Sequence, residues 1–215
     1  AEAVARYLMI AEMADLPVNI VHLSTNRSLE AVERARQRGQ SVYVETCPQY
    51  LLLDDHLYDA PNFEAAKYVC SQPLRKREDQ QALWQGIKEG AINTISTDHC
   101  SFNFHGQKTV GKDDFSKIPN GMPGVETRPE LIYTEGVAKG RITLEKMVAL
   151  LSENIAKQFP MYPQKGVVQE GSDADLVVWD PRTTGVIAAR TQLQNVDYTP
   201  YEGFETQGQA RMVYL

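Results

Sequence analysis

The strongest constraint on the fold is a repeated alternation of amphipathic helical patterns with short, β-prone apolar runs. The helical patterns cover residues 1–15, 29–39 and 77–89. The apolar runs that follow them cover residues 18–23, 41–46 and 91–97. Helical spacing of apolar residues marks the first group, and unbroken β-prone runs mark the second. Strands that alternate with helices across short joints are typical of βαβ units, so the sequence predicts an α/β fold with a parallel sheet.

Two of the predicted strands end near side chains that are suited to chemistry. His22 lies at the end of the first strand, and Asp98 follows the third. In parallel α/β proteins, ligands and catalytic side chains gather beyond the carboxyl ends of the strands. Local alternatives remain, since Asp98 is also suited to cap a turn and His22 to be a hydrogen-bonded core residue. We interpret His99 and Cys100, which border Asp98, as structural supports, and we assign no role to His56.

Two loops have the composition of ligand-binding segments. Ser71 lies in a long, irregular connection at 50–76, and long loops within a compact domain are usually functional. Asn120 lies in the segment 118–125, whose two prolines and two glycines indicate a backbone of defined shape. Such a backbone can offer peptide groups to a small polar ligand. By itself, however, Ser71 is better explained as an ordinary turn serine, and a rigid connector is the alternative for 118–125.

Composition excludes several classes of partner. The net charge of −6 over 215 residues gives no electrostatic footprint for nucleic acid. No apolar run approaches the roughly 20 residues that a membrane helix needs. The three cysteines are an odd number without CxxC spacing, so neither a disulfide framework nor a thiolate zinc site is expected. These features predict a cytoplasmic protein that binds neither nucleic acid nor membranes.

The character of the sequence changes after Pro163. Before it, helical and strand patterns alternate; after it, β-branched runs are broken by glycine and aspartate. We therefore expect two parts, with residues 1–163 in the α/β part and residues 164–215 in a small β unit. The chain starts within a helical pattern and ends within a strand-like run, so we expect it to be a piece of a longer polypeptide.

Five segments together resemble the hydantoinase and dihydropyrimidinase branch of the amidohydrolase superfamily, with phenylhydantoinase-type bacterial enzymes most similar. The segments are 21–24 (VHLS), 45–54 (ETCPQYLLLD), 96–100 (STDHC), 119–126 (PNGMPGVE) and 171–181 (GSDADLVVWDP). The resemblance extends over essentially the whole chain. It implies part of a (β/α)8 TIM-type barrel in residues 1–163, followed by part of a small β-sandwich domain in residues 164–215.

The resemblance also implies roles for the candidate residues. His22 is expected to bind one zinc ion of a binuclear centre, and Asp98 to bind the other and to act as the catalytic acid/base. The backbone at Ser71 and Asn120 is expected to hold a small cyclic amide substrate, such as a hydantoin or dihydropyrimidine. The complete enzyme is expected to be a homotetramer.

Other elements of the family's metal site are not in this sequence. A His-x-His pair, a further histidine and the carboxylated lysine that bridges the two metals belong to earlier strands. A complete barrel takes about 250 residues, so we expect this chain to carry the C-terminal half of the fold and half of the active site. Half a barrel exposes open strand edges.

Two kinds of alternative remain. Dihydroorotase and allantoinase relatives share the metal chemistry but differ in the loops that recognise the substrate. Collapsin response mediator proteins are non-catalytic relatives that keep the fold for assembly. An inactive fragment would also lack catalytic activity. The presence of both His22 and Asp98 argues against a non-catalytic protein.

Overall fold

Three parallel strands form the sheet that organises the larger part of the molecule. The computed structural model describes residues 1–215, and its strands are β1 (Val18–Ile20), β2 (Val42–Thr46) and β3 (Thr94–Ile95). β2 lies between the other two, with Val18 opposite Val42 and Glu45 opposite Thr94. The predicted α/β fold with a parallel sheet is confirmed. All three strands therefore end at the same edge of the sheet.

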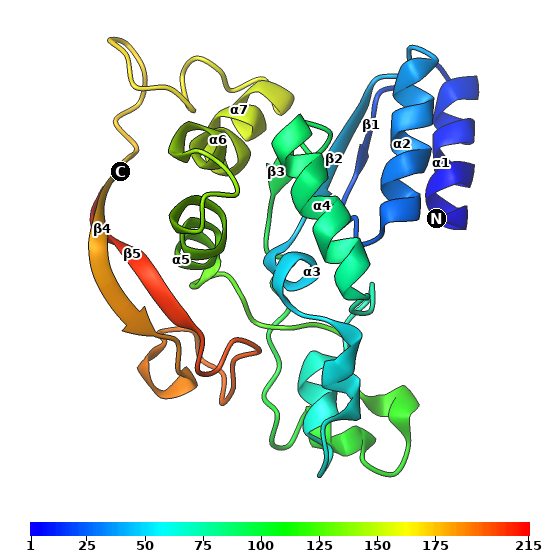
Figure 1. The fold of residues 1–215 in the computed structure, drawn as a ribbon, viewed down its shortest axis with the longest axis vertical. Coiled ribbons are helices and arrows are strands. Elements are labelled where there is room, and N and C mark those ends of the chain that lie inside the picture. Colours follow the sequence, from blue (N-terminus) through cyan, green and yellow to red (C-terminus); the bar gives the residue numbers. More distant parts are fainter.

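Three helices lie side by side along this sheet (Figure 1). They are α1 (Glu2–Met13), α2 (Asn26–Gln37) and α4 (Arg77–Glu89). Their apolar residues and those of the strands form one buried cluster, in which Val32, Val44 and Leu83 are fully shielded from solvent. The bounds of α4 match the prediction, and Gly90 ends it in the left-handed conformation that glycine favours.

Two strands are shorter than predicted, and each has its own local reason. The run at 18–23 is a strand only to Ile20, because His22 takes a positive φ of 40° that extended structure does not allow. The run at 91–97 pairs only at Thr94 and Ile95. Before it, the side chain of Asn93 accepts a hydrogen bond from the Val44 N–H at 2.8 Å in place of a backbone carbonyl.

The long connection between β2 and α4 is less irregular than predicted. It contains α3 (Pro48–Leu52) and the 3-10 helices η1 (Asp55–Asp59) and η2 (Glu64–Tyr68). The loop after β3 contains two more 3-10 helices, η3 (Lys108–Gly111) and η4 (Phe115–Lys117). Single turns like these carry too weak a periodic signal to be read from sequence.

The helices after the loops have π-helical turns inside them. The first helical segment joins α5 (Arg128–Ile132) to η5 (Tyr133–Ala138). The second joins α6 (Leu144–Val148), η6 (Ala149–Glu153) and α7 (Asn154–Gln158). Thr143 caps the second segment by accepting a hydrogen bond from the Lys146 N–H. None of the helices combines the length and the apolar character that a membrane-spanning helix needs.

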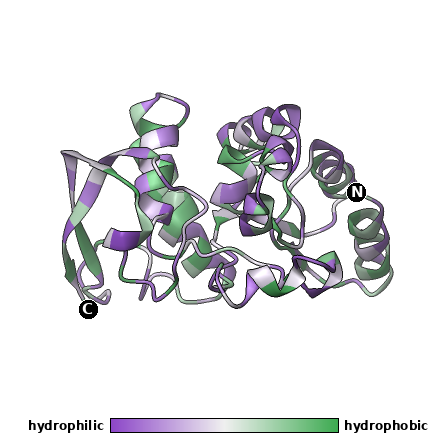
Figure 2. Cartoon of the chain, turned by 90° about the horizontal axis from the view of Figure 1, so that it is seen from below, coloured by the Kyte–Doolittle hydropathy of each residue, from purple (hydrophilic) through white to green (hydrophobic).

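An antiparallel hairpin closes the chain, with β4 (Leu176–Val186) and β5 (Glu205–Tyr214) as its strands. It lies at the far side of the helices from β1, and the two termini lie at opposite ends of the molecule (Figure 2). The ring of Trp179 packs on that of Tyr133 at 5.3 Å, which holds the hairpin to the helices. Val177, Met212 and Val213 are half exposed.

The segment 187–204, between the hairpin strands, returns to the loops of the α/β part. It carries the short 3-10 helix η7 (Ala189–Thr191). The carboxylate of Asp197 accepts hydrogen bonds from the N–H groups of Phe104 and His105, and Tyr201 is buried beside Leu131. The division at residue 163 stays a prediction, and these contacts show that part of 164–215 packs against the first part.

Arg36 joins α2 to the starts of two strands, and its replacement tests this joint. Its guanidinium donates to the carbonyl of Val42, to that of Ala91 and to the side chain of Asn93. In the full-length protein, Arg36→Met is expected to lower the free energy of unfolding by about 2–4 kcal/mol, because several buried acceptors lose their donor. Arg34→Met is the control, since Arg34 is exposed and pairs only with Glu30. Equal unfolding curves for the two variants would contradict the assignment.

Candidate functional site

His22 and Asp98 share an unusual backbone conformation at the carboxyl edge of the sheet. His22 lies two residues beyond β1 and has a φ of 40°; Asp98 lies three residues beyond β3 and has a φ of 48°. Only three other non-glycine residues of the chain have a positive φ. Such backbone strain costs about 1–3 kcal/mol for a residue and tends to persist at functional sites. The two sequence-predicted metal ligands are therefore among the few strained positions of the chain.

Thr46, at the end of the central strand, ties the two flanking strand ends to each other. Its hydroxyl donates to the carbonyl of Leu23 at 2.8 Å, and its carbonyl accepts from the Ser96 N–H at 3.0 Å. Leu23 follows His22 directly, and Ser96 precedes Asp98 by two residues. The structure thus brings both candidates to one edge, on either side of β2. Sequence reasoning missed Thr46, which is fully buried and whose only signal was its place at the end of a strand.

The segment that carries Ser71 lies next to Asp98. Burial raises the pKa of the neighbouring Cys70 thiol to about 11, and the negative charge of Asp98 adds to that rise. The backbone after Ser71 is held in place, because the Gln72 carbonyl accepts hydrogen bonds from the hydroxyl of Tyr50 and from the thiol of Cys70, both at 3.0 Å. Ser71 itself is exposed.

The segment that carries Asn120 completes the edge. The Gly121 N–H donates to the carbonyl of Val69 at 3.0 Å, and the Cys100 N–H donates to that of Met122 at 3.2 Å. These bonds place 69–72, 97–100 and 119–122 beside one another, so Ser71, Asp98 and Asn120 come from adjoining segments. The side chains of Asp98 and Asn120 are exposed, and that of His22 is partly buried.

His99 has the supporting role predicted for it. Its Nδ1 accepts hydrogen bonds from the N–H groups of Gly124 and Val125, at 3.1 and 3.2 Å. A histidine that accepts through Nδ1 while neutral keeps its proton on Nε2. The ring therefore anchors the 119–125 segment to the segment of Asp98.

Two hollows near the sheet do not enclose this edge. One of about 320 Å³ is lined by His22 and Gln72 together with residues of α1 and β1, but by neither Asp98 nor Asn120. A larger one, of about 680 Å³, lies along α3 and α4 and touches none of the candidates. Neither of these two hollows joins His22 to Asp98 and Asn120.

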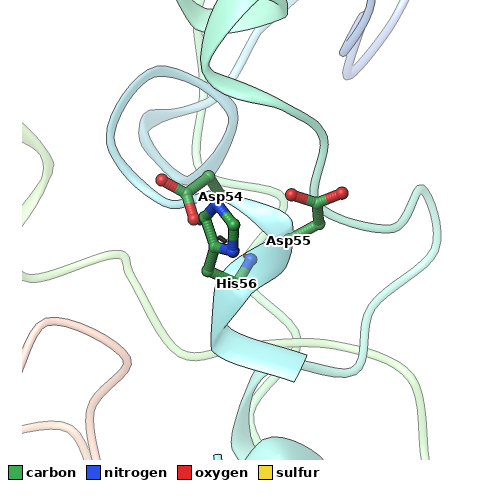
Figure 3. Close-up of side chains that lie close together, drawn as sticks. All are labelled: Asp54, Asp55 and His56. Atoms are coloured by element: carbon green, nitrogen blue, oxygen red, sulfur yellow. Dashed lines mark hydrogen bonds between the residues drawn. The ribbon is translucent and has the colours of Figure 1, made fainter. Parts of the chain in front are cut away.

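A second group of possible metal ligands lies outside this edge, at Asp54, Asp55 and His56 (Figure 3). One ligand atom from each lies within 4.8 Å of the others. Both carboxylates already have cationic partners, with Asp54 at 2.9 Å from Arg77 and Asp55 at 3.4 Å from Lys76. Burial raises the pKa of Asp54, but the hydrogen bonds from Arg77 and from the His56 N–H outweigh this and hold the pKa below its usual value. Asp54 also caps η1, which explains this group without a metal.

The sequence and the fold agree with a known family. The sequence pattern of the Amidohydrolase family matches residues 2–215, and the chain belongs to that family. It is 46% identical over 208 residues to the D-hydantoinase of Geobacillus stearothermophilus. The aligned region covers 97% of this chain and 44% of that protein. It is 46% identical over 209 residues to a D-phenylhydantoinase of Escherichia coli O1:K1, covering 97% of this chain and 45% of the relative.

A solved structure shows the same fold. The crystal structure of dihydropyrimidinase from Brevibacillus agri superposes with a TM-score of 0.97 at 45% identity, covering 99% of this chain and 46% of that one. The resemblance seen in the sequence is confirmed. The chain spans about half the length of the curated relatives it matches.

Gly121 is the position at which the adjoining segments leave least room. A Cβ there would lie 2.5 Å from the Cβ and 2.8 Å from the carbonyl oxygen of Cys100, and φ is 140°. Gly121→Ala is therefore expected to lower the free energy of unfolding by about 1–3 kcal/mol, because either the loop or Cys100 must move. Gly124→Ala is the control, since a Cβ there meets only Tyr201, at 4.0 Å. Thermal unfolding of both variants in the full-length protein measures the difference, and an unchanged Gly121→Ala protein would contradict the close approach.

Proposed function

We propose that this chain is the C-terminal half of a zinc-dependent hydrolase that opens the ring of a cyclic amide, a hydantoin or a dihydropyrimidine. In this proposal residues 1–163 form part of a (β/α)8 barrel and residues 164–215 part of a β-sandwich. The observation that carries it is the pair of strained residues, His22 and Asp98, at one carboxyl edge of a parallel sheet. The names of the relatives, which are hydantoinases and a dihydropyrimidinase, supply the substrate class.

The donor set at this edge fits zinc. Imidazole and carboxylate groups are common zinc ligands, and three or four such ligands make a complete site. Unlike Asp54 and Asp55, Asp98 has no cationic side chain in ion-pair contact. We assign His22 to one zinc ion and Asp98 to the other, with the remaining ligands, including the carboxylated lysine, outside this chain. When bound, zinc lowers the pKa of a water molecule and polarises the scissile carbonyl group.

The residues of this chain supply positioning and proton transfer. The exposed backbone at Ser71 and Asn120 holds the cyclic amide, which reduces the freedom lost on reaching the transition state. Asp98 accepts a proton as a water oxygen adds to the amide carbon. Asp98 then returns that proton to the ring nitrogen as the C–N bond breaks. The product is one open chain with a terminal ureido nitrogen and a carboxyl group, which releases the second proton of the water to solvent.

The same proposal covers the oligomeric state, the location and the partners of the complete protein. We infer a homotetramer in the cytoplasm, whose partner is a small molecule and neither nucleic acid nor a membrane; the family resemblance and the net charge of −6 support this. A non-catalytic assembly protein or an inactive fragment is not favoured, because the similar proteins carry the names of hydrolases.

Replacement of Asp98 tests the catalytic assignment. In the full-length protein, Asp98→Asn is expected to lower kcat/KM for hydantoin and dihydrouracil by about 10³-fold or more, because an amide cannot shuttle the proton. Asp113→Asn, an exposed aspartate of the following loop, is the control and should keep the parent rate. Ring opening is measured as the loss of substrate absorbance. A parent protein that opens neither ring would remove the proposal.

Metal content separates the two groups of possible ligands. His22→Gln is expected to lose about one zinc ion per chain after dialysis, because a ligand of a three- or four-coordinate site is removed. The variant His56→Gln, from the group beside Arg77, should keep the zinc content of the parent protein. Elemental analysis of both purified proteins gives the answer. Loss of zinc from His56→Gln with His22→Gln unaffected would assign the metal to the other group.

A further inference from the structure

Lys108 is a buried cation in the loop between β3 and α5 that no part of the proposed chemistry uses. Its side chain is 0% exposed. Lysine is almost never fully buried unless it is paired, because the ammonium loses its hydration. Here it makes no ion pair; its Nζ donates to two backbone carbonyls instead, that of Val69 at 3.0 Å and that of Pro119 at 3.1 Å.

The two carbonyls belong to the two segments assigned to substrate. Val69 precedes Ser71 by two residues, and Pro119 directly precedes Asn120. The carbonyl of Val69 also accepts from the Gly121 N–H at 3.0 Å. The ammonium and this backbone bond therefore join the segments on both sides of Asn120, so that one segment cannot shift without the other.

The backbone at Lys108 is itself held by hydrogen bonds. Its N–H donates to the carbonyl of Asn103 at 3.1 Å, and the next N–H, of Thr109, donates to that of Phe104 at 3.0 Å. The N–H of Phe104 is in turn bound by the carboxylate of Asp197 at 2.6 Å. The lysine thus reaches the two segments from a loop that is anchored to the segment 187–204.

Burial at this position is energetically unfavourable for the charge. Desolvation lowers the pKa of Lys108 to about 8, and the nearby thiols of Cys70 and Cys100 only partly offset it. An apolar side chain of similar length would avoid that penalty. A lysine here is explained by the charge-assisted hydrogen bonds to both carbonyls, which are roughly twice as strong as neutral ones.

We propose that Lys108 is a positioning residue that sets the spacing between the backbone at Ser71 and the backbone at Asn120, and through it the affinity for the cyclic amide. The inference rests on the proposed function for its substrate. It assigns Lys108 no contact with the substrate and no proton transfer. Its effect falls on binding, while Asp98 and the metal ligands keep their places.

The test is Lys108→Met in the full-length, zinc-loaded protein, with Lys112→Met as the matched control. Lys112 lies just after the same 3-10 helix and is exposed. For Lys108→Met we expect KM for dihydrouracil to rise about tenfold while kcat changes less than about threefold, because binding geometry is lost and the chemistry is not. Zinc content should equal that of the parent. An unchanged KM, or a loss confined to kcat, would overturn the proposal.

Amide hydrogen exchange provides a readout that does not depend on activity. Exchange at the Gly121 amide should become about tenfold faster or more in Lys108→Met, since its acceptor loses the ammonium that fixes it. Exchange in peptides covering β2 should not change. If the parent protein opens no ring, faster exchange at Gly121 still supports the positioning role while the proposed function fails; unchanged exchange overturns the positioning role in either case.

A milder variant carries the test if Lys108→Met does not fold. Lys108→Gln keeps two N–H donors and no charge on a shorter stem, so it reaches at most one of the two carbonyls. We expect its KM to rise about threefold or more, by the loss of one hydrogen bond. A folded Lys108→Gln protein with the KM of the parent would overturn the proposal.

Discussion

The hydrogen bonds around Thr46 are the interaction on which the candidate site depends. Parallel strands deliver their carboxyl ends to one edge, but the pairing of β1 stops at Ile20 and that of β3 at Ile95. Beyond those points the chain is free to diverge unless something holds it. The hydroxyl and the carbonyl of Thr46 bind the flanking segments at Leu23 and Ser96, and the residues that leave the ladder are kept over the end of β2.

Strain and support are distributed differently along this edge. His22 and Asp98 take left-handed backbone angles that neither the local sequence nor the ladder favours. The surroundings that hold them are well satisfied: His99 accepts two backbone N–H groups, and the long loops meet through backbone hydrogen bonds. A rigid frame around two strained residues is the arrangement expected where geometry serves binding or catalysis.

The chain forms two separate sheets, one of three strands and one of two. The aliphatic residues of the three-stranded sheet are buried, whereas those of the hairpin β4–β5, such as Val177 and Met212, remain exposed. The relatives are about twice as long as this chain. The 187–204 segment shows that the hairpin region contributes to the loops as well as to its own sheet.

The sequence by itself determined the parallel α/β fold, the bounds of α4, the order of the elements and the placement of His22 and Asp98 after strands. These follow from hydrophobic periodicity and from glycine and threonine signals at helix ends, which act over a few residues. The roles of Ser71 and Asn120 came only from family resemblance and remain proposals. Only the tertiary structure decided where the strands end, because that depends on the φ of His22 and on the side chain of Asn93. It also revealed Thr46 and Lys108, since hydrogen bonds between segments tens of residues apart leave no periodic pattern in the chain.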